Sequence, residues 1–232
     1  MKRFAKVPDA EKPVSRQLLV INPNTSPSIS ELLQRHVQEA AGAGVTVRAV
    51  TARFGAPYIS DEASYAVATH AALDAWSAAL QDGAARPDAV LIGCFGDPGL
   101  FALREACGVP VTGLAEASFA EARRRGRFAV VTGGAKWAAI LQRLAQSLGY
   151  GDALIDVHTV EATGAELAAD PDAARALLAS ACRAGARTPG AQAVVLGGAG
   201  LAGMAAAIGP ALGLPLIDSV EAGARWAQAG AG

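Results

Sequence analysis

Short apolar runs alternate with longer stretches of helical spacing along most of the chain. The runs are bounded by turn residues, and they predict eight strands at residues 17–22, 45–50, 88–94, 110–114, 127–132, 154–160, 193–198 and 214–218. Because these runs are almost continuously apolar and helices separate most of them, they are typical of parallel sheets that are covered on both faces. The pattern therefore predicts an α/β fold.

The second part of the chain repeats the order of the first. LLVINPN resembles FAVVTGG, DAVLIGCFGDPGL resembles QAVVLGGAGLAGM, and VPVTGLAEA resembles LPLIDSVEA, each at an offset of about 105–110 residues. We expect two similar α/β halves, one from residues 17–111 plus 213–232 and the other from residues 112–212. The loops that follow their strands would then line a shared cleft, where α/β proteins bind ligands.

One stretch of the second half has the form of a dinucleotide-binding fingerprint. Gly198, Gly200 and Gly203 spell G-x-G-x-x-G, and Asp218 follows at the distance of a ribose-binding carboxylate. However, only about 29 residues remain after Gly203, which is too few for a dinucleotide domain. We prefer the interpretation that this loop and GCFGDPG line one cleft from two sides. No nicotinamide, flavin or other cofactor is expected.

Composition narrows the classes of partner. The chain has 232 residues, of which 52% are hydrophobic and 18% charged, with a formal net charge of −1 and no basic stripe. These values argue against nucleic acid and anionic membranes as partners. Three cysteines fit a reducing, cytoplasmic location. Residues 1–16 are polar, lack the apolar core of a signal peptide, and are expected to form a loose extension.

Several motifs together resemble the aspartate/glutamate/hydantoin racemase superfamily, and within it the hydantoin racemase branch. They are LLVINPNTSPS, LIGCFGDPGL, PVTGLAEASF, FAVVTGGAKW and VVLGGAGLAGM. The resemblance implies two flavodoxin-like halves with mostly parallel four-stranded sheets, related by a pseudo-twofold axis. It also implies an active site in the cleft that needs no cofactor or metal and uses two cysteines on opposite faces of the substrate. Cys94 matches the first cysteine, whereas Gly198 occupies the position of the second.

Cys94 is therefore the candidate acid/base. It lies between a strand and an expected helix start, where backbone amides would lower the pKa of the thiol. Cys107 and Cys182 lie in helical patterns, and we interpret both as structural. The other candidate residues follow strands in either half and would bind substrate: Asn22, Asn24, Thr25, Tyr58, Phe95, Gly96, Thr132, Gly133, Gly134, Gly197, Ala199 and Gly200.

Some of these assignments have alternatives. The polar residues of NPNTS either contact a ligand or form a turn that caps the next helix. Tyr58 and Tyr65 either donate to a developing enolate or only pack. Asp97 either orients the loop after Cys94 or caps its helix. Glu116 and Glu221 are interpreted as structural, and the spacing of the histidines predicts no metal site.

Three functions remain open. The first is racemisation or epimerisation of a carbon acid next to carbonyl groups, with a small carboxylate or imide such as a hydantoin as substrate. The second is a single-cysteine lyase that resembles arylmalonate decarboxylase, and the third is an inactive binding homologue. A homo-oligomer is also expected.

Overall fold

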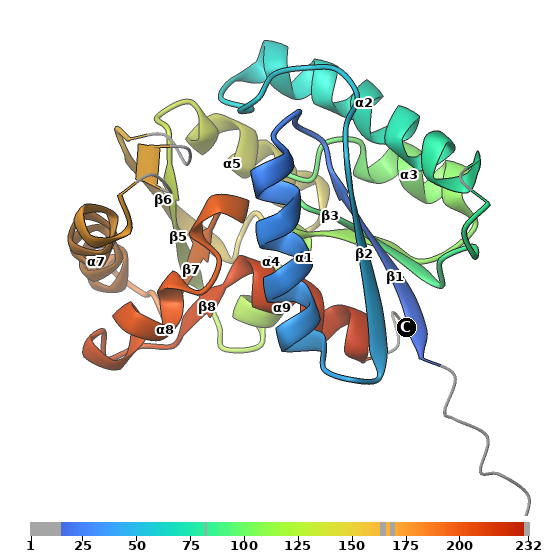
Figure 1. Cartoon of the computed structure of the whole chain (residues 1–232). Coiled ribbons are helices and arrows are strands. Elements are labelled where there is room, and N and C mark those ends of the chain that lie inside the picture. The colour runs from blue at the N-terminus through green and yellow to red at the C-terminus, as the bar shows by residue number, and fades with distance from the viewer. Residues whose placement is uncertain (1–14, 82, 163–165, 168–169, 230–232) are drawn as a thin grey trace, which may run out of the picture.

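The computed structural model describes residues 15–81, 83–162, 166–167 and 170–229 (Figure 1). It contains two four-stranded sheets, with strand orders β2-β1-β3-β4 and β6-β5-β7-β8. Every strand pair is parallel. The strands are β1 (Arg16–Asn22), β2 (Val45–Thr51), β3 (Ala89–Ile92), β4 (Val111–Gly113), β5 (Phe128–Gly133), β6 (Leu154–Val160), β7 (Ala193–Gly197) and β8 (Leu216–Asp218).

The prediction of eight strands in two similar α/β halves is thereby confirmed. Both sheets have the same order, which is that of flavodoxin-like folds. The inner strands β1, β3, β5 and β7 carry the apolar runs that the pattern singled out, and the side chains of these runs are almost completely buried. Burial on both faces explains why those runs are continuous rather than alternating.

Helices connect the parallel strands and cover the sheets. They are α1 (Pro27–Ala41), α2 (Glu62–Gln81), α3 (Leu100–Cys107), α4 (Leu114–Arg123), α5 (Trp137–Ser147), α7 (Pro171–Arg187), α8 (Met204–Ile208) and α9 (Ser219–Gln228). Helices α1 and α2 contact β1, and α7 contacts β5, β6 and β7. Among the described residues, no helix has the length and apolarity of a membrane span.

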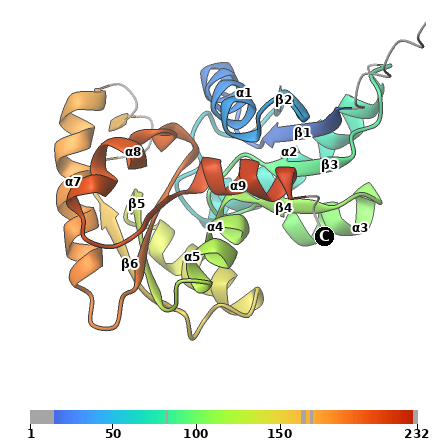
Figure 2. The ribbon, with the colours of Figure 1, turned by 90° about the horizontal axis from the view of Figure 1, so that it is seen from below.

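The structure corrects the two boundaries expected between the halves. Residues 216–218 form β8, which pairs with β7 in the second sheet, although residues 213–232 were assigned to the first half. Residues 112–113 complete β4 of the first sheet rather than opening the second half. The assignment of the final helix to the first half has a physical basis, because α9 packs against α1 as well as α4 near the middle of the molecule (Figure 2).

The expected loose extension falls mostly outside the described residues. Residues 1–14 are not described, and Arg16 already belongs to β1, where it pairs with Val45. Since strands β1, β3, β5 and β7 are inner and parallel, the loops at their carboxyl ends emerge at one edge of each sheet. Helices α4 and α9 pack against each other, and each contacts strands of both sheets.

Candidate active site

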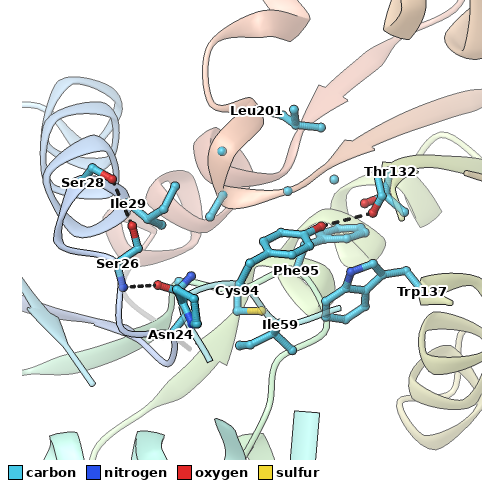
Figure 3. Close-up of a pocket in the computed structure, with 18 residues that line it drawn as sticks. Asn24, Ser26, Ser28, Ile29, Ile59, Cys94, Phe95, Thr132, Trp137 and Leu201 are labelled. Carbon is cyan, nitrogen blue, oxygen red and sulfur yellow. Dashed lines mark hydrogen bonds between the residues drawn. The ribbon is translucent and has the colours of Figure 1, made fainter. Parts of the chain in front are cut away.

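Loops from both halves enclose a pocket with a volume of about 180 Å³ (Figure 3). It opens at the carboxyl ends of the inner strands, as the repeat predicts. Its lining residues are Asn24, Ser26, Ser28, Ile29, Pro57, Tyr58, Ile59, Gly93, Cys94, Phe95, Thr132, Gly133, Trp137, Gly197, Gly198, Ala199, Gly200 and Leu201. The structure thus brings together most of the candidate residues, including Cys94 and Gly198.

Cys94 lies two residues after β3, with 8% of its surface exposed. The carbonyl oxygen of Cys94 accepts a hydrogen bond from the Asp97 N–H at 3.1 Å, which closes a tight turn. The expectation of a lowered pKa is wrong. Helix α3 begins only at Leu100, so its N-terminal amides do not stabilise a thiolate at Cys94. Burial raises the pKa of the thiol, and the neighbouring Asp97 carboxylate raises it further, so the free protein holds a protonated thiol.

The matching loop of the second half offers only backbone at the corresponding position. Gly198 has a φ of +148° and donates its N–H to the Ser219 hydroxyl at 3.2 Å. A Cβ at this position would lie 3.2 Å from Cγ of Leu201, a side chain that is buried between the loop and the second sheet. At Gly197, the ring of Phe95 fills the space that a side chain would need. The wall around position 198 is therefore apolar.

Neither of the other cysteines lines the pocket. Cys107 ends α3 and Cys182 lies in α7, and both are buried. Burial raises the pKa of Cys107 to about 11 and that of Cys182 to about 12, which makes both thiols unreactive near neutral pH. Their positions agree with the structural interpretation.

The loop after β1 is built on a network of short polar side chains. Asn22 is completely buried and donates to Asn24 Oδ1 at 2.9 Å and to the Ser30 hydroxyl at 3.0 Å. The same Asn24 oxygen accepts the Ser26 N–H at 2.9 Å. Asn22 therefore supports the loop from below, and it does not line the pocket as a substrate ligand would. Helix α1 begins with Pro27 after Ser26, so neither Asn24 nor Thr25 is its N-cap.

Three further candidates do not line the pocket. Thr25 donates its N–H to the Ala56 carbonyl, and Gly134 donates its N–H to the Val160 carbonyl. Gly96 accepts a hydrogen bond from the Tyr65 hydroxyl at 2.8 Å. Tyr65 thus has a packing and loop-holding role, whereas Tyr58 lines the pocket and donates to the Gly133 carbonyl at 3.5 Å.

Sequence reasoning missed several lining residues. They are Ser26, Ser28, Ile29, Pro57, Ile59, Gly93, Trp137 and Leu201. Most of them neighbour a predicted residue in the chain, so a wider window around each motif would have included them. Trp137 is the first residue of α5, and nothing in its spacing marks it as a pocket residue rather than a core residue.

No charged side chain is among the described residues that line the pocket. Hydroxyl and amide groups come from Asn24, Ser26, Ser28 and Thr132, and an apolar wall comes from the aromatic and aliphatic residues. No group of three or more His, Cys, Asp or Glu side chains that could hold a metal ion occurs in the described parts of the chain. The arrangement offers one thiol, several neutral hydrogen-bonding groups and an apolar surface to a small molecule.

Asp218 has no free carboxylate for a ribose. It is almost fully buried, and its oxygens accept the N–H groups of Gly203, Val220 and Glu221 at 2.8 to 3.3 Å. The loop follows β7, an inner strand of the four-stranded sheet β6-β5-β7-β8. Two of the three glycines of the apparent fingerprint, Gly198 and Gly200, line the pocket, and Gly203 does not.

Two flavodoxin-like halves that share a pocket with one buried cysteine define the class of two-lobed racemase-type enzymes. A family model for Asp/Glu/Hydantoin racemase matches residues 18–227, and the chain belongs to this family. It is 32% identical over 217 residues to a hydantoin racemase from Paenarthrobacter aurescens, which covers 91% of this chain and 89% of the relative.

Solved structures agree with this assignment. An allantoin racemase from Klebsiella pneumoniae is 30% identical and superposes with a TM-score of 0.86, covering 93% of this chain and 87% of the other. A liganded mutant of arylmalonate decarboxylase, 21% identical, has a TM-score of 0.66 and shares the fold, with 94% and 93% of the two chains covered. The similarities to the hydantoin and allantoin racemases support an isomerase of the racemase type.

Proposed function

We propose that this protein catalyses proton transfer at a carbon next to carbonyl groups in a hydantoin or a related amino-acid derivative, with Cys94 as the proton-transferring group. The observation that carries the proposal is the position of Cys94, the single thiol among the described residues of a pocket that both halves build. The hydantoin and allantoin racemases among the similar proteins support the substrate class.

The pocket suits a neutral or singly charged ring with an apolar substituent. Asn24 Oδ1 already accepts hydrogen bonds from Asn22 and Ser26, which leaves the NH₂ group of Asn24 for a carbonyl oxygen of the substrate. Hydroxyl donors from both halves would stabilise negative charge on the substrate oxygens as the carbon loses its proton. The apolar wall excludes water and strengthens these interactions.

Racemisation through Cys94 proceeds in two proton transfers. A base removes the proton bound to the carbon, whose electron pair moves onto the adjacent carbonyl oxygens as an enolate. An acid then returns a proton to the opposite face of the carbon. In this proposal Cys94 serves one face, and a lining hydroxyl or a water molecule accepts or donates the proton at the other face. The acidity of the carbon comes from its own carbonyl groups.

A second candidate reaction is favoured by two observations on the same pocket. Position 198 carries no thiol, and the raised pKa of Cys94 keeps this residue in the acid form. A protonated thiol suits decarboxylation of a malonate-like acid. The bond to the departing CO₂ breaks, its electron pair stays as an enediolate, and Cys94 delivers the proton from one face. The fold shared with arylmalonate decarboxylase is compatible with this reaction.

The test is turnover in deuterated water, followed by proton NMR and chiral chromatography. An enantiopure 5-substituted hydantoin that loses its α-proton signal and its optical purity together supports the racemase. A prochiral arylmalonate that yields one enantiomer of the monoacid supports the lyase. Cys94→Ala should abolish either activity in a folded protein. Retained turnover in that variant would remove Cys94 from the mechanism, and binding without any exchange would indicate an inactive homologue.

A further inference from the structure

Asp97 stands out in the loop that carries Cys94. Its side chain is 1% exposed, yet it is a carboxylate. It is also the one non-glycine residue with a positive φ, +52°, among residues 15–81, 83–162, 166–167 and 170–229. A non-glycine residue in this region is strained unless its surroundings hold it there. Two turns are built on Asp97, since its N–H donates to the Cys94 carbonyl and its carbonyl accepts the Leu100 N–H.

The Asp97 carboxylate fastens this loop to a different helix. Its two oxygens accept the N–H groups of Ala115 at 2.9 Å and Glu116 at 2.8 Å, in the first turn of α4. The N-cap residue of α4 is Gly113, which has no side chain to cap the helix itself. A Cβ at Gly113 would overlap the Asp97 carboxylate. Asp97 thus caps α4 from the Cys94 loop, not α3 as its position in the chain suggests.

We propose that Asp97 is a positioning residue for Cys94, which locks the loop carrying the thiol to the N-terminus of α4 and keeps a buried carboxylate on the turn that the Cys94 carbonyl closes. The proposal rests on the proposed function only in taking Cys94 as the reacting group. A carboxylate that only stabilised α4 could come from any residue near the helix N-terminus. Asp97 instead belongs to the tight turn that fixes the Cys94 backbone, so its bonds to α4 also hold Cys94 in place.

The charged and titratable groups around this turn are few. Tyr65 approaches from α2, and Glu116 lies in α4, where it pairs with Arg104 of α3 at 2.5 Å. Burial raises the pKa of Asp97 to about 7, so the carboxylate is ionised at the higher pH where a thiol titrates. Its negative charge then opposes formation of the Cys94 thiolate.

The direct test measures thiol reactivity rather than turnover. Asp97→Asn keeps the size of the side chain and removes its charge. The rate of Cys94 alkylation by iodoacetamide, read from the mass of the peptide that contains it, should rise about tenfold near pH 9. Such a rise corresponds to a fall of about one unit in the pKa of the thiol, the size expected when a neighbouring like charge is removed.

Asp218→Asn is the matched control, because Asp218 is also a buried carboxylate that caps a helix, α9, from the other half. It should destabilise the protein without changing the pH dependence of Cys94 alkylation. Identical alkylation profiles for wild type and folded Asp97→Asn would overturn the proposal, as would an equal rise in Asp218→Asn. If the alkylation profile of Asp97→Asn shifts but the wild-type protein turns over none of the tested carbon acids, the proposed function fails and the positioning role of Asp97 stands.

A second variant covers the case in which Asp97→Asn does not fold. Asp97→Glu keeps the charge but displaces the carboxylate by one methylene, so the turn around Cys94 must shift. We expect kcat to fall about tenfold or more with KM little changed, since small misplacements of a reacting group have large effects on rate. The pH profile of alkylation should stay close to that of wild type. An unchanged kcat in the folded variant would refute the positioning role.

Discussion

Position 198 permits a sharp test of the site, because the variant Gly198→Cys places a second thiol on the loop that lines the pocket opposite the Cys94 loop. If racemisation is limited by the lack of a proton donor on that face, the variant should racemise an enantiopure substrate much faster than wild type. A well-placed general acid or base contributes about 10²–10⁴-fold in rate. This range corresponds to about 3–5 kcal/mol of activation free energy.

The structure also sets the cost of this substitution. Gly198 has a φ of +148°, and strain of this kind costs on the order of 1–3 kcal/mol for a residue with a side chain. The new Cβ would lie 3.2 Å from Leu201, which must shift by a few tenths of an ångström. Both effects lower the free energy of unfolding rather than raise the reaction barrier. Because domains have about 5–15 kcal/mol of stability, the variant should still fold.

The assay follows the loss of optical rotation together with exchange of the α-proton in deuterated water. Gly198→Ala is the matched control, since it introduces the same Cβ and the same strain without a thiol. Gly198→Cys combined with Leu201→Ala relieves the contact and separates crowding from chemistry. If both thiol variants fold and bind substrate but racemise no faster than Gly198→Ala, the inference that position 198 lies across the substrate from Cys94 is wrong.

Other predictions concern the remaining thiols and the buried carboxylate. Cys107→Ser and Cys182→Ser should each lower the free energy of unfolding by about 1–3 kcal/mol, because a hydroxyl replaces a buried thiol, and should leave kcat unchanged in the folded protein. Thermal melts and steady-state kinetics check both, and a large loss of kcat would give these residues a role in the reaction. Burial raises the pKa of Asp97 from its ordinary value of 3.8 to about 7, so between these values the folded protein binds a proton that the unfolded chain has released. Wild type should therefore lose stability relative to Asp97→Asn as the pH rises from about 4 to 7, which denaturant titrations across this range measure; a constant difference would contradict the raised pKa.

The strands and their order could be predicted because their signals are local and repeated. Each inner strand is buried on both faces, so its apolar run is unbroken, and the repeat of LLVINPN as FAVVTGG marks the same strand in both halves. The assignment of residues 216–218 to the first half is wrong, because a strand of three residues has too short an apolar pattern to show which sheet it joins. Only the contact between β7 and β8, together with α9 crossing to α1, settles where this segment belongs.

The pocket was predicted in outline but not residue by residue. Asn22 and Asn24 are the same residue type and lie two positions apart in one motif, so the sequence does not distinguish them. Asn22 is completely buried beneath the loop, whereas Asn24 lines the pocket. The pKa of Cys94 is raised first by burial of the thiol and then by the Asp97 carboxylate, and α3 begins too late in the chain to oppose this. The start of α3 and the position of the carboxylate are set by backbone turns with positive φ at Gly96 and Asp97, and such turns leave no signal in the hydrophobic pattern.

The two halves share a scaffold, but the chemistry they bring to the pocket is unequal. In each half a buried aspartate ties the loop after the third strand to the helix after the fourth: Asp97 joins its loop to α4, and Asp218 joins Gly203 to α9. The loop held by Asp97 presents the Cys94 thiol to the pocket. The loop held by Asp218 presents Gly198, which lies against the side chain of Leu201. A carbon between them meets a proton donor on one side and an apolar wall on the other. Such a pocket delivers a proton from the Cys94 side, and racemisation in it requires a hydroxyl of the lining or a water molecule to serve the second face.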